Sequence, residues 1–197
     1  MHFVNKAKIL TFVLIMLLFL PSILVSHPHV FISSNINVVF DANGFQGFKI
    51  HWSFDDFFSS MIANDYDQNG NGIFDEKEVQ LIHKGAFSNL KNFNYFTTIR
   101  VKEIPYKING TKNFNATLTK GKMSYFFFIP VKGNNIKEIV FSQYDATYYT
   151  DIAISSKVTN KSRKFKIEST LYENKNKSFY NGMVHPREIK IKIRQKK

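Results

Sequence analysis

Hydrophobic residues alternate with mostly polar ones along two segments near the start of the chain, 29–40 and 45–54. This pattern predicts half-buried β-strands, because successive side chains of a strand point to opposite faces of the sheet. The connecting sequence DANG is typical of a tight turn, so the two segments predict a hairpin. If both hydrophobic sets face one core, the paired residue numbers have an even sum, which favours a three-residue loop 42–44 and places His51 opposite Asn35.

The remaining pattern predicts further strands and one helical insertion. Strand-like segments separated by Gly or Asn clusters follow at 95–108, 114–119, 123–130, 136–144, 150–158, 164–172 and 188–193. Many short strands with turns between them are typical of an antiparallel β-sandwich. On both sides of the polar stretch 67–78, hydrophobic residues recur roughly at helical spacing instead. The expected fold is mainly β, an antiparallel β-sandwich with an inserted helix–EF-hand loop–helix at about 55–93.

The twelve residues DQNGNGIFDEKE (67–78) match an EF-hand calcium loop. Such a loop supplies oxygen ligands from positions one, three, five, seven, nine and twelve, with glycine at position six. The expected calcium ligands are Asp67, Asn69, Asn71, Ile73 through its backbone carbonyl, Asp75 and Glu78. Gly72 stands at position six, and Phe74 is the apolar residue wanted at position eight. The sequence has no second loop of this pattern, so a structural or buffering calcium is expected; the alternative is a surface turn rich in Asx and Gly.

The amino terminus has the layout of a secretory signal peptide. Lys6 and Lys8 precede an apolar run at 9–20, and a short segment then leads to Ser26. We expect residues 1–26 to be removed on export to the periplasm, which leaves a single β-rich domain at 27–197. An uncleaved membrane anchor is the alternative, because Leu24 is a mediocre residue three positions before the cut. Contact with a membrane is expected only through this segment.

Charge and composition exclude several classes of function. The net charge of +12 becomes +10 without residues 1–26, because that segment holds two lysines and no acid. The basic residues are scattered rather than gathered in one motif, so nucleic acid is not an expected partner. The chain has no cysteine, which excludes zinc-finger, thiol-redox and cysteine-nucleophile chemistry. Its 21 Phe and 9 Tyr residues supply apolar area for a core without disulfides.

His27, Pro28 and His29 give the second chemical signal. On an extended segment, residues two apart point to the same side, so His27 and His29 can converge on one metal ion. A free amino group at His27 would add a third nitrogen, as in the histidine brace of exported copper proteins. Nitrogen ligands suit a divalent transition metal: zinc, nickel, cobalt or copper. The alternative is that both histidines are only exposed polar residues.

Other candidate ligands are weaker. By strand rise, the predicted hairpin places His51 about 20 Å from His29, too far to share one ion. His83 is expected on the surface of a helix, and His185 precedes the last strand. Asp145 and Asp151 are either carboxylate ligands or ordinary turn and edge residues.

Four segments in order resemble domain of unknown function family 1007: HPHVFI, HWSFDDFFSSMIANDYDQNGNGIFDEKEV, NFNYFTTI and QYDATYYTDIAI. The resemblance covers most of the mature chain. It implies a periplasmic component of a transport system, often encoded beside permeases of the nickel/cobalt type, some linked to zinc. An inner-membrane metal permease would then be the partner. His27 and His29 match the family's amino-terminal HPH, and 67–78 matches its acidic loop, although Asn69 and Asn71 stand where carboxylates are common.

Three hypotheses about function follow. The first is a periplasmic metal-binding accessory protein that captures a divalent transition metal or hands it to a permease, with calcium in the EF-hand. The second is a histidine-brace copper enzyme; the sequence has no GxSxG, no HExxH and no carboxylate pair of notable spacing, so no enzyme is expected. The third is a calcium-stabilised exported binding or structural protein without a transition metal.

Overall fold

The computed structural model describes residues 28–133 and 135–196. The expected signal peptide and His27 lie outside these ranges. The strands are β1 (Val30–Asp41), β2 (Gly44–Phe54), β3 (Thr97–Val101), β4 (Ile104–Pro105), β5 (Lys112–Thr119), β6 (Lys122–Pro130), β7 (Glu138–Gln143), β8 (Thr150–Ile154), β9 (Thr159–Asn160), β10 (Phe165–Glu173) and β11 (Arg187–Gln195). The helices are α2 (Asp56–Tyr66), α3 (Glu76–Gly85) and the 3-10 helix η1 (Phe87–Phe96). No helix in the described ranges has the length and apolar character needed to cross a membrane.

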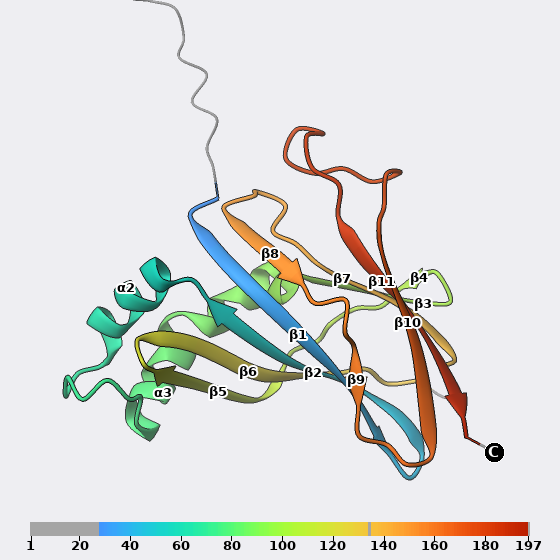
Figure 1. Cartoon of the computed structure of the whole chain (residues 1–197), viewed down its shortest axis with the longest axis horizontal. Coiled ribbons are helices and arrows are strands. Elements are labelled where there is room, and N and C mark those ends of the chain that lie inside the picture. The colour runs from blue at the N-terminus through green and yellow to red at the C-terminus, as the bar shows by residue number, and fades with distance from the viewer. Residues whose placement is uncertain (1–27, 134, 197) are drawn as a thin grey trace, which may run out of the picture.

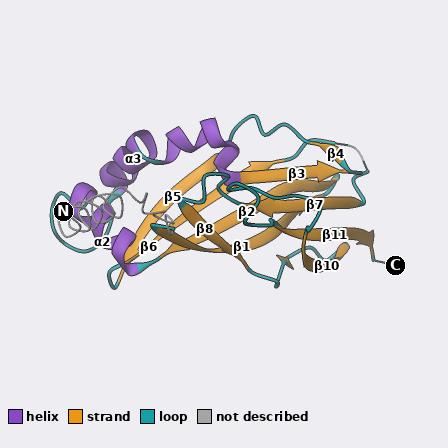
Figure 2. Ribbon diagram, turned by 90° about the horizontal axis from the view of Figure 1, so that it is seen from above, coloured by secondary structure: helices purple, strands orange, loops and turns teal. Residues whose placement is uncertain are grey.

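The strands form two sheets that pack as a sandwich (Figures 1 and 2). The first sheet has the order β5-β6-β2-β1-β8, with β9 also paired to β1, and the second has the order β10-β11-β7-β3-β4. The predicted mainly β sandwich is confirmed. It departs from a purely antiparallel arrangement at one edge, where β8 and β9 run parallel to β1. There the chain leaves β7 of the second sheet and returns to the first sheet in the direction of β1.

The β1–β2 hairpin has the predicted even register, with Asn35 opposite His51. The predicted three-residue loop is wrong, because Asp41 pairs with Gly44 and only residues 42 and 43 connect the strands. Instead, a bulge between Val39 and Phe40 shifts the register by one residue. From Val39 back toward the start of β1, the paired residue numbers then have the predicted even sum. Further along β2, Gly47 is required by close approach of β6, since a Cβ there would lie 2.1 Å from the Ile129 carbonyl oxygen.

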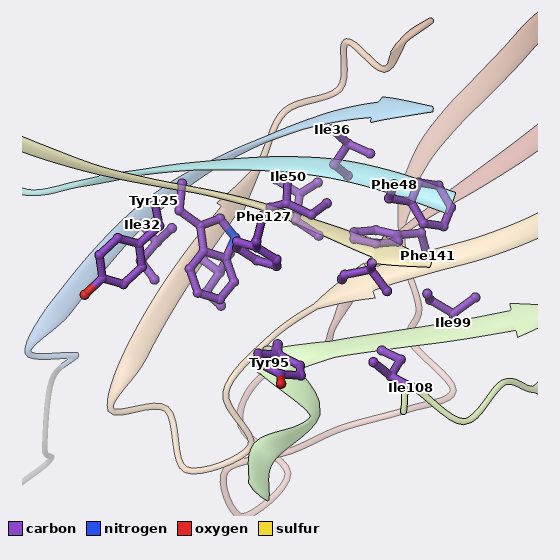
Figure 3. Close-up of a cluster of buried hydrophobic side chains, with 14 of the residues drawn as sticks. Ile32, Ile36, Phe48, Ile50, Tyr95, Ile99, Ile108, Tyr125, Phe127 and Phe141 are labelled. Carbon is purple, nitrogen blue, oxygen red and sulfur yellow. The ribbon is translucent and has the colours of Figure 1, made fainter. Parts of the chain in front are cut away.

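The hydrophobic core lies between the sheets (Figure 3). Even-numbered residues of β1, and of β2 from Phe48 onward, point into it, as the alternating pattern predicts. On the turn side of the bulge the alternation shifts, and Phe45 is buried in the core. Phe48 of the first sheet meets Phe141 of the second with ring centroids 4.8 Å apart. One polar group also bridges the layers: Gln143 Oε1 on β7 accepts a hydrogen bond from Ser34 Oγ on β1 at 2.5 Å. A buried amide needs such partners, because an unsatisfied polar group in the core is costly.

The inserted helices cover one end of the first sheet (Figure 2). Ile62 of α2 and Ile82 of α3 are buried in the core cluster, as is Phe87 at the start of η1. Ser59 on α2 accepts a hydrogen bond at 3.0 Å from the backbone N–H of Met123 on β6. This bond ties the helical insertion to the sheet that carries it.

The predicted strand at 95–108 is interrupted in the structure. Tyr95 belongs to η1, and a turn at Lys102 and Glu103 separates β3 from β4. Both turn residues have positive φ, 50° and 63°. Neither is Gly, Asn or Asp, the residue types that usually mark such turns, so the sequence carried no local signal for this break.

Candidate metal sites

The loop 67–78 connects α2 to α3, and a capping motif within it fixes the start of α3. Asp75 is the N-cap of α3: its Oδ1 accepts a hydrogen bond from the Glu78 N–H at 2.9 Å. In return, Glu78 Oε2 accepts one from the Asp75 N–H at 2.9 Å, which completes a capping box. Phe74, just before the cap, is buried in the core cluster. The loop is therefore anchored where it joins α3.

Side chains at the first, third and fifth loop positions turn toward the loop's own backbone. Asp67 Oδ2 accepts a hydrogen bond from the Gly72 N–H at 2.8 Å. Asn69 Oδ1 accepts one from the Asn71 N–H at 3.0 Å, and Asn71 Oδ1 accepts one from the Ile73 N–H at 2.8 Å. Gly72 has φ of +74°, which permits the sharp turn at position six. Three side-chain oxygens are thus held along one tight loop.

Glu78 is a buried carboxylate that joins the two ends of the loop. Its residue exposure is 2 %. Oε1 accepts a hydrogen bond from the Gln68 N–H at 2.8 Å, while Oε2 bonds the Asp75 N–H at the other end. The ion pairs found within the described ranges do not include Glu78. A buried negative charge without a cationic partner is unfavourable, so the position suits a bound cation.

The donor chemistry of the loop fits calcium, which prefers oxygen ligands. Its acidic donors are Asp67, Asp75 and Glu78, and the remaining expected donors are two amides and one backbone carbonyl. In the described part of the chain, no group of three or more His, Cys, Asp or Glu side chains is placed to hold a metal ion. A calcium site here would depend on the amide and carbonyl oxygens as well as the acids.

His29 directly precedes β1, whose start lies beside the segment that leads into β8 (Figure 1). Its backbone N–H donates to the Tyr149 carbonyl oxygen at 2.8 Å, and the two side-chain rings have centroids 5.0 Å apart. The His29 side chain is exposed. Because His27 lies outside the described residues, the predicted convergence of the two imidazoles stays a prediction.

Two of the weaker candidates line a hollow of about 260 Å³ next to β8. They are Asp151, opposite Phe31 in the parallel β1–β8 pair, and His185. His185 Nδ1 is 2.6 Å from the Lys177 carbonyl oxygen, which can only accept a hydrogen bond. In the neutral ring Nδ1 therefore carries the proton, which leaves the Nε2 lone pair for a metal ion.

Asp145 has a structural role. Its side-chain oxygens accept hydrogen bonds from the Thr147 N–H at 2.9 Å, the Thr147 hydroxyl at 2.7 Å and the Thr150 N–H at 3.1 Å. These bonds shape the turn that leads into β8. The interpretation of Asp145 as a turn residue therefore explains its contacts.

The other two histidines among the described residues lie elsewhere. His83 is exposed on α3, with its ring 5.1 Å from that of Phe114. His51 lies opposite Asn35 of β1, six residues after His29, as predicted. Its ring stacks on that of Phe126 of β6, with ring centroids 4.4 Å apart. It lines a groove on the outer face of the first sheet. Sequence reasoning missed this groove, because its lining residues come from segments far apart in the chain.

A buried ionic network on the second sheet also escaped prediction. Glu188 on β11 is 1 % exposed and accepts two hydrogen bonds at 2.8 Å from Arg100 on β3. The Tyr172 hydroxyl donates a third at 2.7 Å. Burial by itself raises the pKa of Glu188, but these hydrogen bonds outweigh it and lower the pKa to about 2. The network is structural, since its acceptor oxygens are occupied by side chains of the protein.

Comparison with known proteins agrees with the resemblance seen in the sequence. Residues 12–181 match the family model described as "Protein of unknown function (DUF1007)". The chain belongs to the DUF1007 family. It is 32% identical over 135 residues to an uncharacterized 15.5 kDa protein of Spirochaeta aurantia, which covers 64% of this chain and 93% of the relative. An uncharacterized protein of Haemophilus influenzae is 26% identical over 153 residues, covering 75% of this chain and 72% of the relative.

Proposed function

We propose that this DUF1007 protein is an exported metal-binding accessory protein of a divalent transition-metal transport system, with a calcium ion held in the loop 67–78. The observation that carries the calcium part is the buried carboxylate of Glu78, 2 % exposed and without an ion-pair partner in the described part of the chain. Calcium would neutralise this charge and fix the loop between α2 and α3. Its role would be structural, since the sequence has one such loop.

The transition-metal part depends on His27 and His29, with an inner-membrane permease as the partner that delivers or receives the ion. Support comes from the exposed position of the His29 side chain at the start of β1. Two imidazoles and a terminal amine would leave coordination positions open, which suits transfer of an ion rather than permanent storage. Zinc, nickel, cobalt and copper all accept such nitrogen ligands.

A direct test is titration calorimetry on mature protein that has first been stripped of metal with a chelator. Calcium and each of the four transition metals are titrated separately, and then each transition metal is titrated with calcium present. The proposal expects one calcium site and a separate transition-metal site whose affinity survives calcium saturation. Binding of calcium alone would favour a calcium-stabilised exported binding protein, and binding of neither would overturn both parts.

A further inference from the structure

A groove of about 520 Å³ crosses the outer face of the first sheet, on the side away from the core. Its floor consists of β1, β2 and β6, whose alternate side chains point outward. Asn113, at the start of β5, lines it on one side, and Ser155, Lys157 and Thr159, the first residue of β9, line it on the other. The volume lies in the range of small-molecule sites in proteins, which is about 300–1,000 Å³.

The floor of the groove carries aromatic side chains. His51 and Phe126 stack nearly parallel, with an interplanar angle of 9°, and Phe128 lies two residues further along β6. His51 Nε2 is 3.2 Å from the Ser53 hydroxyl, which helps to orient the ring. Burial lowers the pKa of His51, so its imidazole is uncharged at neutral pH. Each of the two stacked rings covers one face of the other, so another planar ring can pack against the edges or the remaining faces of the pair, edge-to-face or offset-stacked.

The charges around the groove are of one sign. Lys49 on β2 and Lys157 beside β9 both line it, and its lining residues include no Asp or Glu. Neither lysine takes part in an ion pair within the described ranges. The amide side chains of Asn35 and Asn37 add hydrogen-bonding groups along β1. A ligand that complements this lining is negatively charged and carries a flat apolar part.

We propose that the groove binds a small organic anion with a carboxylate and a planar ring. The ring packs on Phe126 and Phe128, and Lys49 and Lys157 attract the carboxylate. This site goes beyond the proposed metal-binding function and does not depend on it, because it contains none of the expected metal ligands. Binding to it can therefore be measured with a chelator present.

The test uses 2-naphthoate as the probe, in EDTA, with 15N-labelled mature protein. We expect saturable binding with a Kd at or below about 1 mM, and amide shift changes concentrated at Asn35, His51, Phe126 and Lys157. The neutral analogue 2-naphthalenemethanol, which keeps the rings, should bind about tenfold more weakly. The double variant Lys49→Gln/Lys157→Gln should lose about tenfold in affinity for naphthoate, because it removes two attractive charges near the surface.

Two further variants separate the ring contact from general charge. Phe126→Leu keeps an apolar side chain but removes the ring, so affinity for both probes should fall severalfold. Lys166→Gln removes one exposed lysine from β10 in the other sheet and should leave binding unchanged. Melting curves verify that each variant is folded. The proposal would be overturned by any one of three results: amide chemical-shift changes that lie outside the groove, equal affinity for the neutral analogue, or full affinity for naphthoate in the double lysine variant.

Discussion

The N–H of Gln68 donates a 2.8 Å hydrogen bond to Oε1 of Glu78, ten residues later in the chain. This bond brings the start of the loop 67–78 against the first turn of α3. The same carboxylate receives the Asp75 N–H, so one buried side chain joins the two ends of the loop. Loop geometry and helix capping therefore both depend on Glu78, and its substitution is the sharpest probe of the proposed calcium site.

Glu78→Gln should weaken calcium binding by about tenfold or more, because it removes a charge and the bidentate ligand. Glutamine can still complete a capping box, so stability without calcium should change less than affinity. In the wild type we expect a Kd of about 10⁻⁴ to 10⁻³ M. Calcium at about 100 times Kd should then stabilise the protein by about 2.7 kcal/mol. Thermal melts across a calcium series measure both effects.

Glu76→Gln is the matched control, since Glu76 is exposed in the same helical turn and is not an expected ligand. It should keep the calcium dependence of the wild type. A wild-type melting temperature that stays constant across this calcium range would mean that 67–78 is only a turn.

His27→Ala and His29→Ala should each reduce the affinity for zinc or copper, whereas His83→Ala should not. His83 is exposed on α3, away from the start of β1, which makes it a suitable control. Affinity should also fall as the solution is made acidic, because protons compete with the metal for the imidazole nitrogens. Titration calorimetry measures each variant. Equal affinity in the His27/His29 double variant and the wild type would disprove this site.

The amino terminus of the exported protein should be His27, because the apolar run 9–20 and the small Ser26 match a cleaved signal peptide. Intact-mass measurement and terminal sequencing of protein from the periplasmic fraction determine the terminus. Protein that still begins at Met1 would contradict the prediction. It would also remove the free amine from the proposed metal ligands.

The Arg100–Glu188 pair should make stability depend on pH in the acidic range. The pKa of Glu188 in the folded protein is about 2, below the ordinary value of 4.5. The ionised carboxylate therefore stabilises the fold fully above about pH 4.5, and this contribution is lost as the pH falls toward 2. Glu188→Gln should flatten this part of the pH profile, which denaturant unfolding at a series of pH values measures.

Removal of the cationic partner gives a complementary test. Arg100→Met should cost about 3 kcal/mol at neutral pH, because it leaves a buried carboxylate without its main partner. Arg194→Met is the control: its ion pair with Glu168 is exposed, and its loss should cost at most about 1 kcal/mol. Similar losses in the two variants would show that the buried pair contributes no more than a surface pair.

Local patterns determined much of this protein. The period of two along β1 and β2 specified which side chains face the core, and the even register placed Asn35 opposite His51. The spacing of oxygen-bearing residues in 67–78 predicted a loop between two helices, and α2 and α3 flank it. These features were predictable because strand alternation, helix capping and tight turns depend on residues close together in sequence.

Only the tertiary structure determined which residues contact each other when they lie far apart in the sequence. The parallel return of β8 beside β1 brings Asp151 next to Phe31, 120 positions earlier, and no local pattern encodes that partner. The Arg100–Glu188 pair joins residues 88 apart. The groove likewise combines Lys49, Phe126 and Lys157 from three separate segments. Hydrophobic alternation tells which face of a strand is buried but not which strand lies beside it, because that choice depends on packing the whole core.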